Sequence, residues 1–185
     1  MYKVAALYID PRGPYPGLLG PEMCWDEKRD ARTYEGPWPV VAHPPCGPWT
    51  RNAFASQQDP NLGRIAFDQV RRFGGVLEQP AHSRLFAECK APKPEESDDV
   101  GTTIEVCQVD WGHVARKRTW LYIVTGKFER FDSMPPKRKP THWCRKQCGQ
   151  IVPHGIKMCS REQRRRTPPA FALWLVQIAA QAAHR

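Results

Sequence analysis

Short apolar runs separated by turn-forming residues characterise the first part of the chain. The run Val4–Ile9 is apolar and partly β-branched, which predicts a buried β-strand. It leads into Asp10–Gly17, a loop rich in proline and glycine. A second buried strand is predicted over Pro39–Ala42, and it continues directly into His43–Gly47. Because prolines and glycines interrupt the pattern, most of the segment from Pro11 to Pro48 is expected to be loop.

Apolar residues at helical spacing predict a helix over Asn61–Phe73. Asp59 or Asn61 is expected to cap its start, and Gly74-Gly75 is expected to end it. The next run, Gly75–Glu78, predicts another buried strand. A helix between two buried strands is typical of a βαβ unit, so the pattern predicts an α/β fold with a mostly parallel sheet.

The pattern changes in the second half of the chain. Residues 90–101 are acidic and rich in lysine and proline, which indicates an exposed loop. Thr102–Val109 and the aromatic run Thr119–Val124 predict two further strands. Residues 126–166 have little periodicity and much positive charge, so they are expected to form an irregular basic segment. A final helix is expected after Thr167 as its N-cap, with Pro168 in the first turn. Its apolar stripe, expected to pack on the core, is Phe171, Trp174, Leu175, Ile178, Ala179 and Ala182.

The chain of 185 residues is long enough for one domain with a core, or for one domain with a small appendage. Its 41% hydrophobic and 25% charged residues are typical of a globular protein. We expect an α/β core over residues 1–125 and a basic insertion or recognition segment that contains cysteine and histidine over 126–166. A helix over residues 167–185 is expected to pack on the core.

Several classes of protein are disfavoured by the sequence. No run of about 18 apolar residues is present, so no membrane-spanning helix is predicted. The first apolar run is too short for a signal peptide and is interrupted by Asp10. Seven cysteines are an odd number, which does not suit a secreted disulfide framework. We therefore expect a cytoplasmic protein with reduced thiols and no membrane partner.

The formal net charge of +9 is concentrated late in the chain. The basic clusters are Pro136–Lys139, Arg145-Lys146 and Arg161–Arg166, and aromatic residues lie among them. A basic surface of this kind attracts polyanions, so DNA is the expected partner. The alternative is a solvated basic surface that only confers solubility.

Three short motifs carry candidate chemistry. Cys46 follows the Pro44-Pro45 pair after a buried strand, where α/β folds collect their ligand sites, and a thiolate there would be a nucleophile. Glu78 ends the next buried strand before a proline, where burying a charge that has no partner or function would be unfavourable. Arg116 and Arg118 alternate in an extended segment, so both are expected to face one anion or base edge. The alternative for each is structural: an inert loop cysteine, a surface glutamate and a basic strand entry.

The order of these motifs resembles that of DNA cytosine-5 methyltransferases. That family carries a Pro-Cys loop after one strand, a Glu-Asn-Val motif at the end of the next and a Gln-x-Arg-x-Arg motif that leads into another strand. The matching residues are Pro45-Cys46, Glu78-Gln79-Pro80 and Val114-Ala-Arg116-Lys-Arg118. The strand Trp120–Val124 is similar to the family's next strand, and Thr167–Phe171 is similar to its last motif, in which a proline pair opens the final helix.

The resemblance implies a truncated Rossmann-like methyltransferase fold and an enzyme that modifies C5 of a pyrimidine in DNA. Cys46 would add to C6, Glu78 would hydrogen-bond the ring edge at N3, and Arg116 and Arg118 would position the base and its phosphate. The target base would have to leave the duplex. Further residues beside the motifs are expected to contact the substrate: His43, Pro45, Gln79 and Lys117.

The largest departure from the family concerns the cofactor. The family's Phe-x-Gly-x-Gly loop binds S-adenosylmethionine, whereas Asp10-Pro-Arg-Gly13 follows the first strand here. Asp10 and Gly13 are thus the cofactor-binding residues that the resemblance implies, in a chain similar to a reduced, divergent, phage-type member. The alternative is a non-catalytic DNA-binding protein derived from this fold, which protects DNA or antagonises a host DNA-acting enzyme.

A cysteine and histidine cluster lies within the basic segment. Its spacing is close to that of a zinc knuckle, although not the usual one, and His142 is a spare ligand. A metal would replace a hydrophobic core in a segment with so little periodicity. The alternative is a set of unliganded cysteines in a basic loop. The candidate zinc ligands are Cys144, Cys148, His154 and Cys159.

Overall fold

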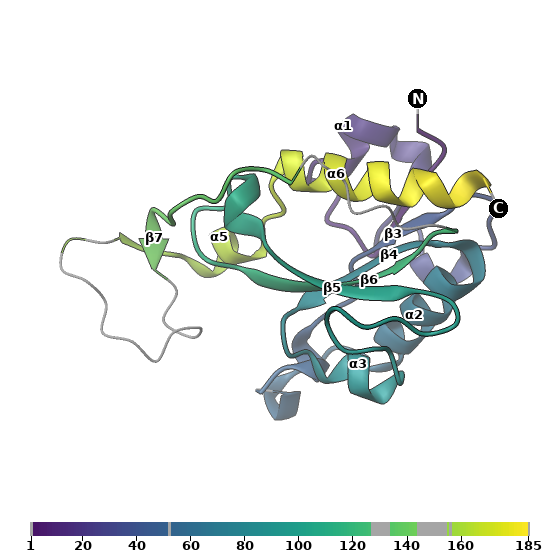
Figure 1. The fold of residues 1–185 in the computed structure, drawn as a ribbon, viewed down its shortest axis with the longest axis horizontal. Helices are drawn as coiled ribbons and strands as arrows, with labels where there is room; N and C mark the ends of the chain where they lie inside the picture. The colour runs from purple at the N-terminus through teal and green to yellow at the C-terminus, as the bar shows by residue number, and fades with distance from the viewer. Residues whose placement is uncertain (1, 52, 127–133, 144–154, 156, 185) are drawn as a thin grey trace.

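The structure is a computed structural model that describes residues 2–51, 53–126, 134–143, 155 and 157–184. Its centre is a six-stranded sheet with helices on both faces (Figure 1). The strand order is β2-β1-β3-β4-β6-β5. The strands are β1 (Ala5–Leu7), β2 (Cys24–Trp25), β3 (Val40–Ala42), β4 (Gly75–Pro80), β5 (Thr102–Cys107) and β6 (Arg118–Val124).

The sheet is mostly parallel, as the sequence predicts. Strands β2, β1, β3 and β4 run in one direction. Strand β6 runs antiparallel to β4, and β5 runs antiparallel to β6, so β5 regains the common direction. The α/β class is confirmed, and the arrangement is compatible with a Rossmann-like fold. The antiparallel insertion of β6 between β4 and β5 is a feature that the local pattern did not predict.

Helices connect and cover the strands. The α-helices are α1 (Tyr15–Leu19), α2 (Asn61–Phe73), α3 (Arg84–Glu88), α5 (Arg161–Arg165) and α6 (Pro169–Ala180). Short 3-10 helices are η1 (Pro21–Met23), η2 (Ala31–Thr33), η3 (Gly47–Trp49), η4 (Ala53–Ala55), η5 (Gln108–Trp111) and η6 (Gln181–His184). A separate two-stranded parallel sheet pairs β7 (His142–Trp143) with β8 (Lys157–Met158).

Alternation of side chains along the strands divides the core between the two faces of the sheet. On one face, Val76 and Leu121 belong to a cluster that includes α6 and Tyr15 of α1. On the other face, Leu77 and Tyr122 pack with α2 and α3. Figure 1 shows α1 and α6 on one side of the sheet and α2 and α3 on the other. The predicted stripe of α6 is buried throughout, which confirms that this helix packs on the core.

Several local expectations need correction. The predicted loop between Pro11 and Pro48 contains α1, β2 and two 3-10 helices. Helix α6 has Pro168 at its N-cap and no side-chain cap, so Thr167 does not cap it. Helix α5 was not predicted, although Ser160 and Gln163 form a reciprocal capping box at its start. The bounds of α2 and its end at Gly74 are confirmed. Neither Asp59 nor Asn61 caps its start, because Pro60 occupies the N-cap without a side-chain cap, although Asp59 accepts a hydrogen bond from the Asn61 amide at 2.8 Å. Among the described residues, no helix is long and apolar enough to cross a membrane.

Candidate functional site

The candidate site lies where the order of the strands reverses. From β1 the chain crosses to β2 on one side, whereas β3 and β4 follow on the other side. In open α/β sheets, the crevice at such a switch point, outside the carboxyl ends of the strands, is the usual place for a ligand. Asp10 follows β1, His43 and Cys46 follow β3, and Glu78 lies near the end of β4. The fold therefore brings the predicted residues of three separate motifs to one edge of the sheet.

Glu78 is a buried carboxylate whose two oxygens both have protein partners. The residue is 8% exposed. Gln108 Nε2 donates to its Oε1 at 2.8 Å, and His43 Nδ1 lies 3.2 Å from its Oε2. Burial raises the pKa of Glu78, but the hydrogen bond from His43, the charge of Lys117 and the bond from Gln108 together lower it below its usual value. Glu78 is therefore ionised at neutral pH.

His43 links Glu78 to a second buried residue. Its Nε2 lies 2.5 Å from the hydroxyl oxygen of Tyr15, and the two rings are 5.2 Å apart between centroids. Tyr15 belongs to α1 and is only 2% exposed. Both nitrogens of His43 are thus engaged with protein groups, so its predicted contact with substrate would require it to leave one of them.

Cys46 lies on a loop that is anchored at several points. Gln79 Nε2 donates to the carbonyl of Pro44 at 2.7 Å, and Ser83 Oγ donates to Gln79 Oε1 at 3.1 Å. Past the cysteine, the Gly47 amide donates to Gln58 Oε1 at 3.2 Å. Gln79, predicted to bind substrate, is 1% exposed and instead ties β4 to the loop that carries the cysteine.

The Cys46 thiol retains its proton at neutral pH in the free protein. The residue is solvent-exposed, yet the protein around its sulfur raises its pKa, and the negative charge of Glu78 raises it further. The charges of Lys117 and Arg165 oppose this effect without overcoming it. A cysteine is a thiolate at rest only where nearby positive charge lowers its pKa enough. The positive charges near Cys46 do not lower its pKa below the usual value. The coupling to Glu78 nevertheless places both residues in one electrostatic environment.

Of the basic motif, Lys117 acts on the site, whereas Arg118 does not. The charge of Lys117 lowers the pKa of both Cys46 and Glu78. Arg118 Nε binds Glu105 Oε1 at 2.6 Å, on the face that Trp120 shares, because side chains alternate along β6.

Glu78 lies two residues after Val76 in β4 and therefore shares the face of the sheet on which Val76 lies. That face is opposite to the face of Arg118. The prediction that Arg116 and Arg118 reach the site together is therefore wrong for Arg118. Arg116 is exposed at the surface. Side chains alternate along β6, and its pairing with β4 and β5 decides which face Arg118 takes.

Three contributing residues were not predicted from the sequence. Tyr15 lies in a region expected to be loop, Gln108 follows β5 at the start of η5, and Arg165 belongs to α5. Gln108 is fully buried. The strand predicted over Thr102–Val109 ends at Cys107, and Gln108 opens η5. A glutamine inside the predicted strand was the one usable signal, because a buried amide needs partners. Nothing local in the sequence pairs Tyr15 with His43, since this contact spans 28 positions of the chain.

The residues after β1 do not fit S-adenosylmethionine. The carboxylate of Asp10 is bound by Arg12 of the same turn, at 2.9 and 3.0 Å. The Gly13 amide donates to the carbonyl of Asp10 at 2.8 Å, so this turn closes on itself. Tyr15, shortly after this turn, is buried against His43. In β2, the ring of Trp25 is covered by the guanidinium of Arg29, at 3.7 Å from the ring centroid.

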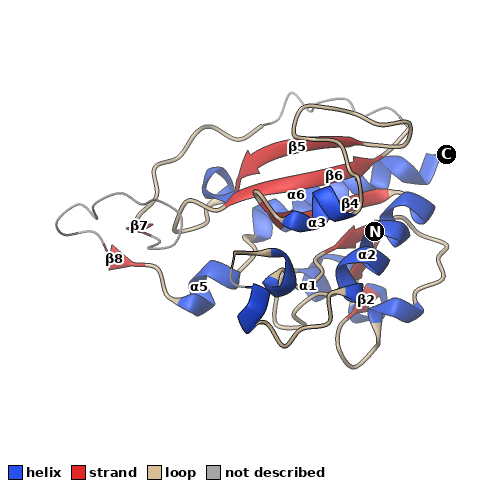
Figure 2. Cartoon of the chain, turned by 90° about the horizontal axis from the view of Figure 1, so that it is seen from below, coloured by secondary structure: helices blue, strands red, loops and turns tan. Residues whose placement is uncertain are grey.

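Helix α5, which belongs to the described part of the basic segment, lies beside the site. His113 Nε2 is 3.0 Å from the carbonyl of Gln163, and Lys117 Nζ donates to the carbonyl of Arg166 at 3.3 Å. These contacts join α5 to the segment before β6. Figure 2 shows α5 and β8 beyond the end of the sheet to which β5 points. Because β5 runs with β1, β3 and β4, that end is the carboxyl edge.

The predicted zinc ligands Cys144, Cys148 and His154 lie outside the described residues, and only Cys159 is described. The described residues contain no group of three or more histidine, cysteine or acidic side chains that could hold a metal ion.

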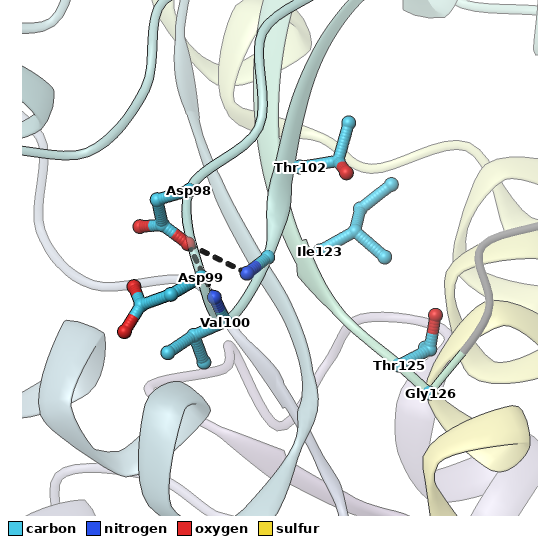
Figure 3. A pocket seen from close by; sticks show the side chains of 8 residues that line it. Asp98, Asp99, Val100, Thr102, Ile123, Thr125 and Gly126 are labelled. Atoms are coloured by element: carbon cyan, nitrogen blue, oxygen red, sulfur yellow. Dashed lines mark hydrogen bonds between the residues drawn. The ribbon is translucent and has the colours of Figure 1, made fainter.

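A cavity of about 210 Å³ lies at the opposite edge of the sheet, beside the start of β5 and the end of β6 (Figure 3). Its main charged group, Asp98, already accepts hydrogen bonds from the amides of Val100 and Gly101 and from the Tyr122 hydroxyl. Arg71 also binds Asp98, at 2.9 Å. This cavity is therefore a structural feature of the 98–101 turn and is separate from the candidate site.

The candidate site thus combines an exposed thiol, a buried ionised carboxylate and a cation that acts on both. The chain was compared with known proteins at the level of family, sequence and structure. No family model, no curated protein sequence and no solved structure matches the chain.

Proposed function

We propose that this protein acts on pyrimidine bases of DNA, with Cys46 adding to C6 of the ring while Glu78 binds the ring edge. The observation that carries the proposal is the pairing of an accessible cysteine with a buried, ionised glutamate at one edge of a mostly parallel sheet. The order of the motifs, which resembles that of DNA cytosine-5 methyltransferases, supports the same assignment. In this interpretation the sheet is a reduced form of the methyltransferase fold.

The reaction proposed for these residues needs no methyl donor. The Cys46 thiol first loses its proton to solvent, and the sulfur electron pair forms the S–C6 bond. The electron pair of the C5–C6 double bond then takes a proton from water at C5. In the reverse direction, C5 loses either of its two hydrogens, the double bond re-forms and the S–C6 bond breaks. The base is regenerated with its C5 hydrogen exchanged for one from solvent.

Basic residues beside the site suit a DNA substrate. Lys117 and Arg165 act on Cys46 electrostatically, and α5 carries further arginines next to them. Contacts of this kind to phosphate position a nucleic acid without reading its sequence. No step of the proposal involves S-adenosylmethionine, because the residues after β1 do not fit it.

The test is hydrogen exchange at C5 in deuterated water. Duplex and single-stranded DNA are incubated with the wild type, Cys46→Ala and Glu78→Gln, and deuterium at C5 is measured by mass spectrometry of the released nucleosides. We expect exchange with the wild type, none with Cys46→Ala and slower exchange with Glu78→Gln. A parallel arm with S-adenosylmethionine reports any gain of a methyl group. Equal exchange by the wild type and Cys46→Ala would refute the covalent mechanism.

A second candidate function is favoured by the raised pKa of Cys46 and by the packing of Tyr15 against His43. It is a non-catalytic DNA-binding protein that protects DNA or antagonises a host DNA-acting enzyme. This candidate predicts DNA binding by the wild type without any C5 exchange, and equal binding by Cys46→Ala. The same set of samples therefore separates the two functions.

A further inference from the structure

Three residues from three different elements form a buried chain of hydrogen bonds behind the site. Tyr15 comes from α1, His43 from the loop after β3 and Glu78 from β4. The distances are 2.5 Å from the Tyr15 hydroxyl to His43 Nε2 and 3.2 Å from His43 Nδ1 to Glu78 Oε2. The relative exposure of the His43 and Glu78 side chains is only 13% and 11%.

The direction of these hydrogen bonds follows from the number of donors. Tyr15 has one hydroxyl hydrogen, and among the described residues its bonded partner is His43 Nε2. A buried donor without a partner is costly, so this hydrogen points at Nε2, which must then carry a lone pair. Burial, followed by the charges of Glu78 and Cys24, raises the pKa of Tyr15 well above its usual value, which keeps the hydroxyl a donor. The proton of a neutral His43 is thereby assigned to Nδ1, which faces Glu78.

We propose that His43 is a positioning residue: Tyr15 holds it in the tautomer protonated on Nδ1, and that N–H fixes the orientation and the negative charge of Glu78. The tautomer is a property of the protein alone, whereas its use toward a base rests on the proposed function. Gln108 holds the other carboxylate oxygen from the opposite side. Each oxygen keeps one lone-pair direction for a ligand.

The consequence concerns the class of ring edge that Glu78 can bind. An ionised carboxylate accepts hydrogen bonds and cannot donate one. It therefore selects a pyrimidine edge that offers a donor, such as the amino group of cytosine or the N3–H of uracil. Tyr15 cannot relay a proton to Glu78 through His43, because that would leave a buried phenolate. His43 thus fixes the protonation state of Glu78 and does not shuttle protons to it.

The tautomer is measured by NMR of protein labelled with ¹⁵N-histidine, with His43→Asn used to assign the signal. We expect the wild type to show a protonated Nδ1 and an unprotonated Nε2 at His43. In Tyr15→Phe the donor to Nε2 is lost, so the share of His43 protonated on Nε2 should rise. A wild type protonated on Nε2 with Nδ1 unprotonated, or a tautomer that Tyr15→Phe leaves unchanged, would overturn the proposal.

A matched pair of amide substitutions separates positioning from mere packing. The side-chain nitrogen of asparagine replaces Nδ1, whereas that of glutamine reaches the place of Nε2. By ¹³C NMR of the Glu78 carboxyl group, we expect His43→Gln to raise the pKa of Glu78 and His43→Asn to keep it close to that of the wild type. The acid limb of the C5 exchange profile should move to higher pH in His43→Gln alone.

Thermal unfolding checks whether both variants fold. If His43→Gln does not fold, the tautomer measurement on Tyr15→Phe tests the proposal in its place. An unchanged Glu78 pKa in His43→Gln refutes the positioning role. If the wild type shows no C5 exchange, the proposed function fails, while the two NMR measurements still decide the tautomer and its effect on Glu78.

Discussion

Replacing Gln108 by methionine removes one donor to the Glu78 carboxylate while nearly preserving side-chain volume. Gln108 is fully buried, and its Nε2 lies 2.8 Å from Glu78 Oε1 and 3.0 Å from Thr119 Oγ1. Thr119 keeps a second partner, the carbonyl of Lys117. The loss at neutral pH is therefore dominated by the hydrogen bond to the charged carboxylate, which is worth about 1.5–3 kcal/mol.

One term opposes this loss. Gln108 Oε1 is buried and has no hydrogen-bond partner among the described residues, so methionine also removes an unsatisfied acceptor worth about 1 kcal/mol. We expect a net loss of about 1.5 kcal/mol in the free energy of unfolding at pH 7. For a protein of this size, that corresponds to a fall in Tm of about 3–6 °C. Urea and thermal unfolding, each followed by circular dichroism, measure both values.

The pH dependence distinguishes this mechanism from ordinary packing. Because the folded-state pKa of Glu78 is lowered, its stabilising effect is present above the unfolded value of about 4.3 and is lost as pH falls through the folded value. The difference between the wild type and Gln108→Met should therefore be constant near neutral pH and shrink toward zero as the pH falls below the unfolded value and through the lower folded value. Comparing the two proteins at each pH cancels the titration of other carboxylates.

Gln79→Met is the matched control for this experiment. Gln79 is equally buried, but its partners are the neutral carbonyl of Pro44 and the hydroxyl of Ser83. Its loss, about 1–2 kcal/mol, should be the same at pH 7 and at acid pH. If the deficit of Gln108→Met were as independent of pH as that of Gln79→Met, the assigned charge of Glu78 would be wrong.

Four further outcomes follow from the site and the core. Because the thiol pKa of Cys46 is raised, wild-type C5 exchange should accelerate from pH 7 to pH 9; a flat profile would contradict thiolate attack. Lys117→Met should slow exchange strongly and Arg118→Met only slightly, because Arg118 binds Glu105 on the other face of the sheet; equal effects would contradict this placement. Arg165→Gln should reduce the slope of log affinity for DNA against log salt by about one, as measured by fluorescence anisotropy. Phe171→Ala, at a fully buried position of α6, should lower the free energy of unfolding by about 3–5 kcal/mol in urea.

The sequence alone determined the elements whose signal is local. Helix α2 has a repeating apolar face and a double glycine after it, so its limits follow from residues within one segment. Strands β3 and β4 are short apolar runs bounded by proline and glycine, and they placed Cys46 and Glu78 at strand ends. Once the strands were expected to be parallel, it followed that these two residues share one edge of the sheet. That step used only strand direction and no side-chain contact.

The tertiary structure decided what depends on pairing between distant segments. The insertion of β6 between β4 and β5 sets the face of each of its residues, and so it directs Arg118 toward Glu105 and away from Glu78. The charge of Glu78 is set by donors from the loop after β3 and from η5, which meet only in the folded sheet. Tyr15 of α1 reaches His43, in the loop after β3, across 28 positions of the chain. Such contacts leave no periodic trace in a single sequence, since each residue of the pair is locally unremarkable and only the packed fold brings the two together.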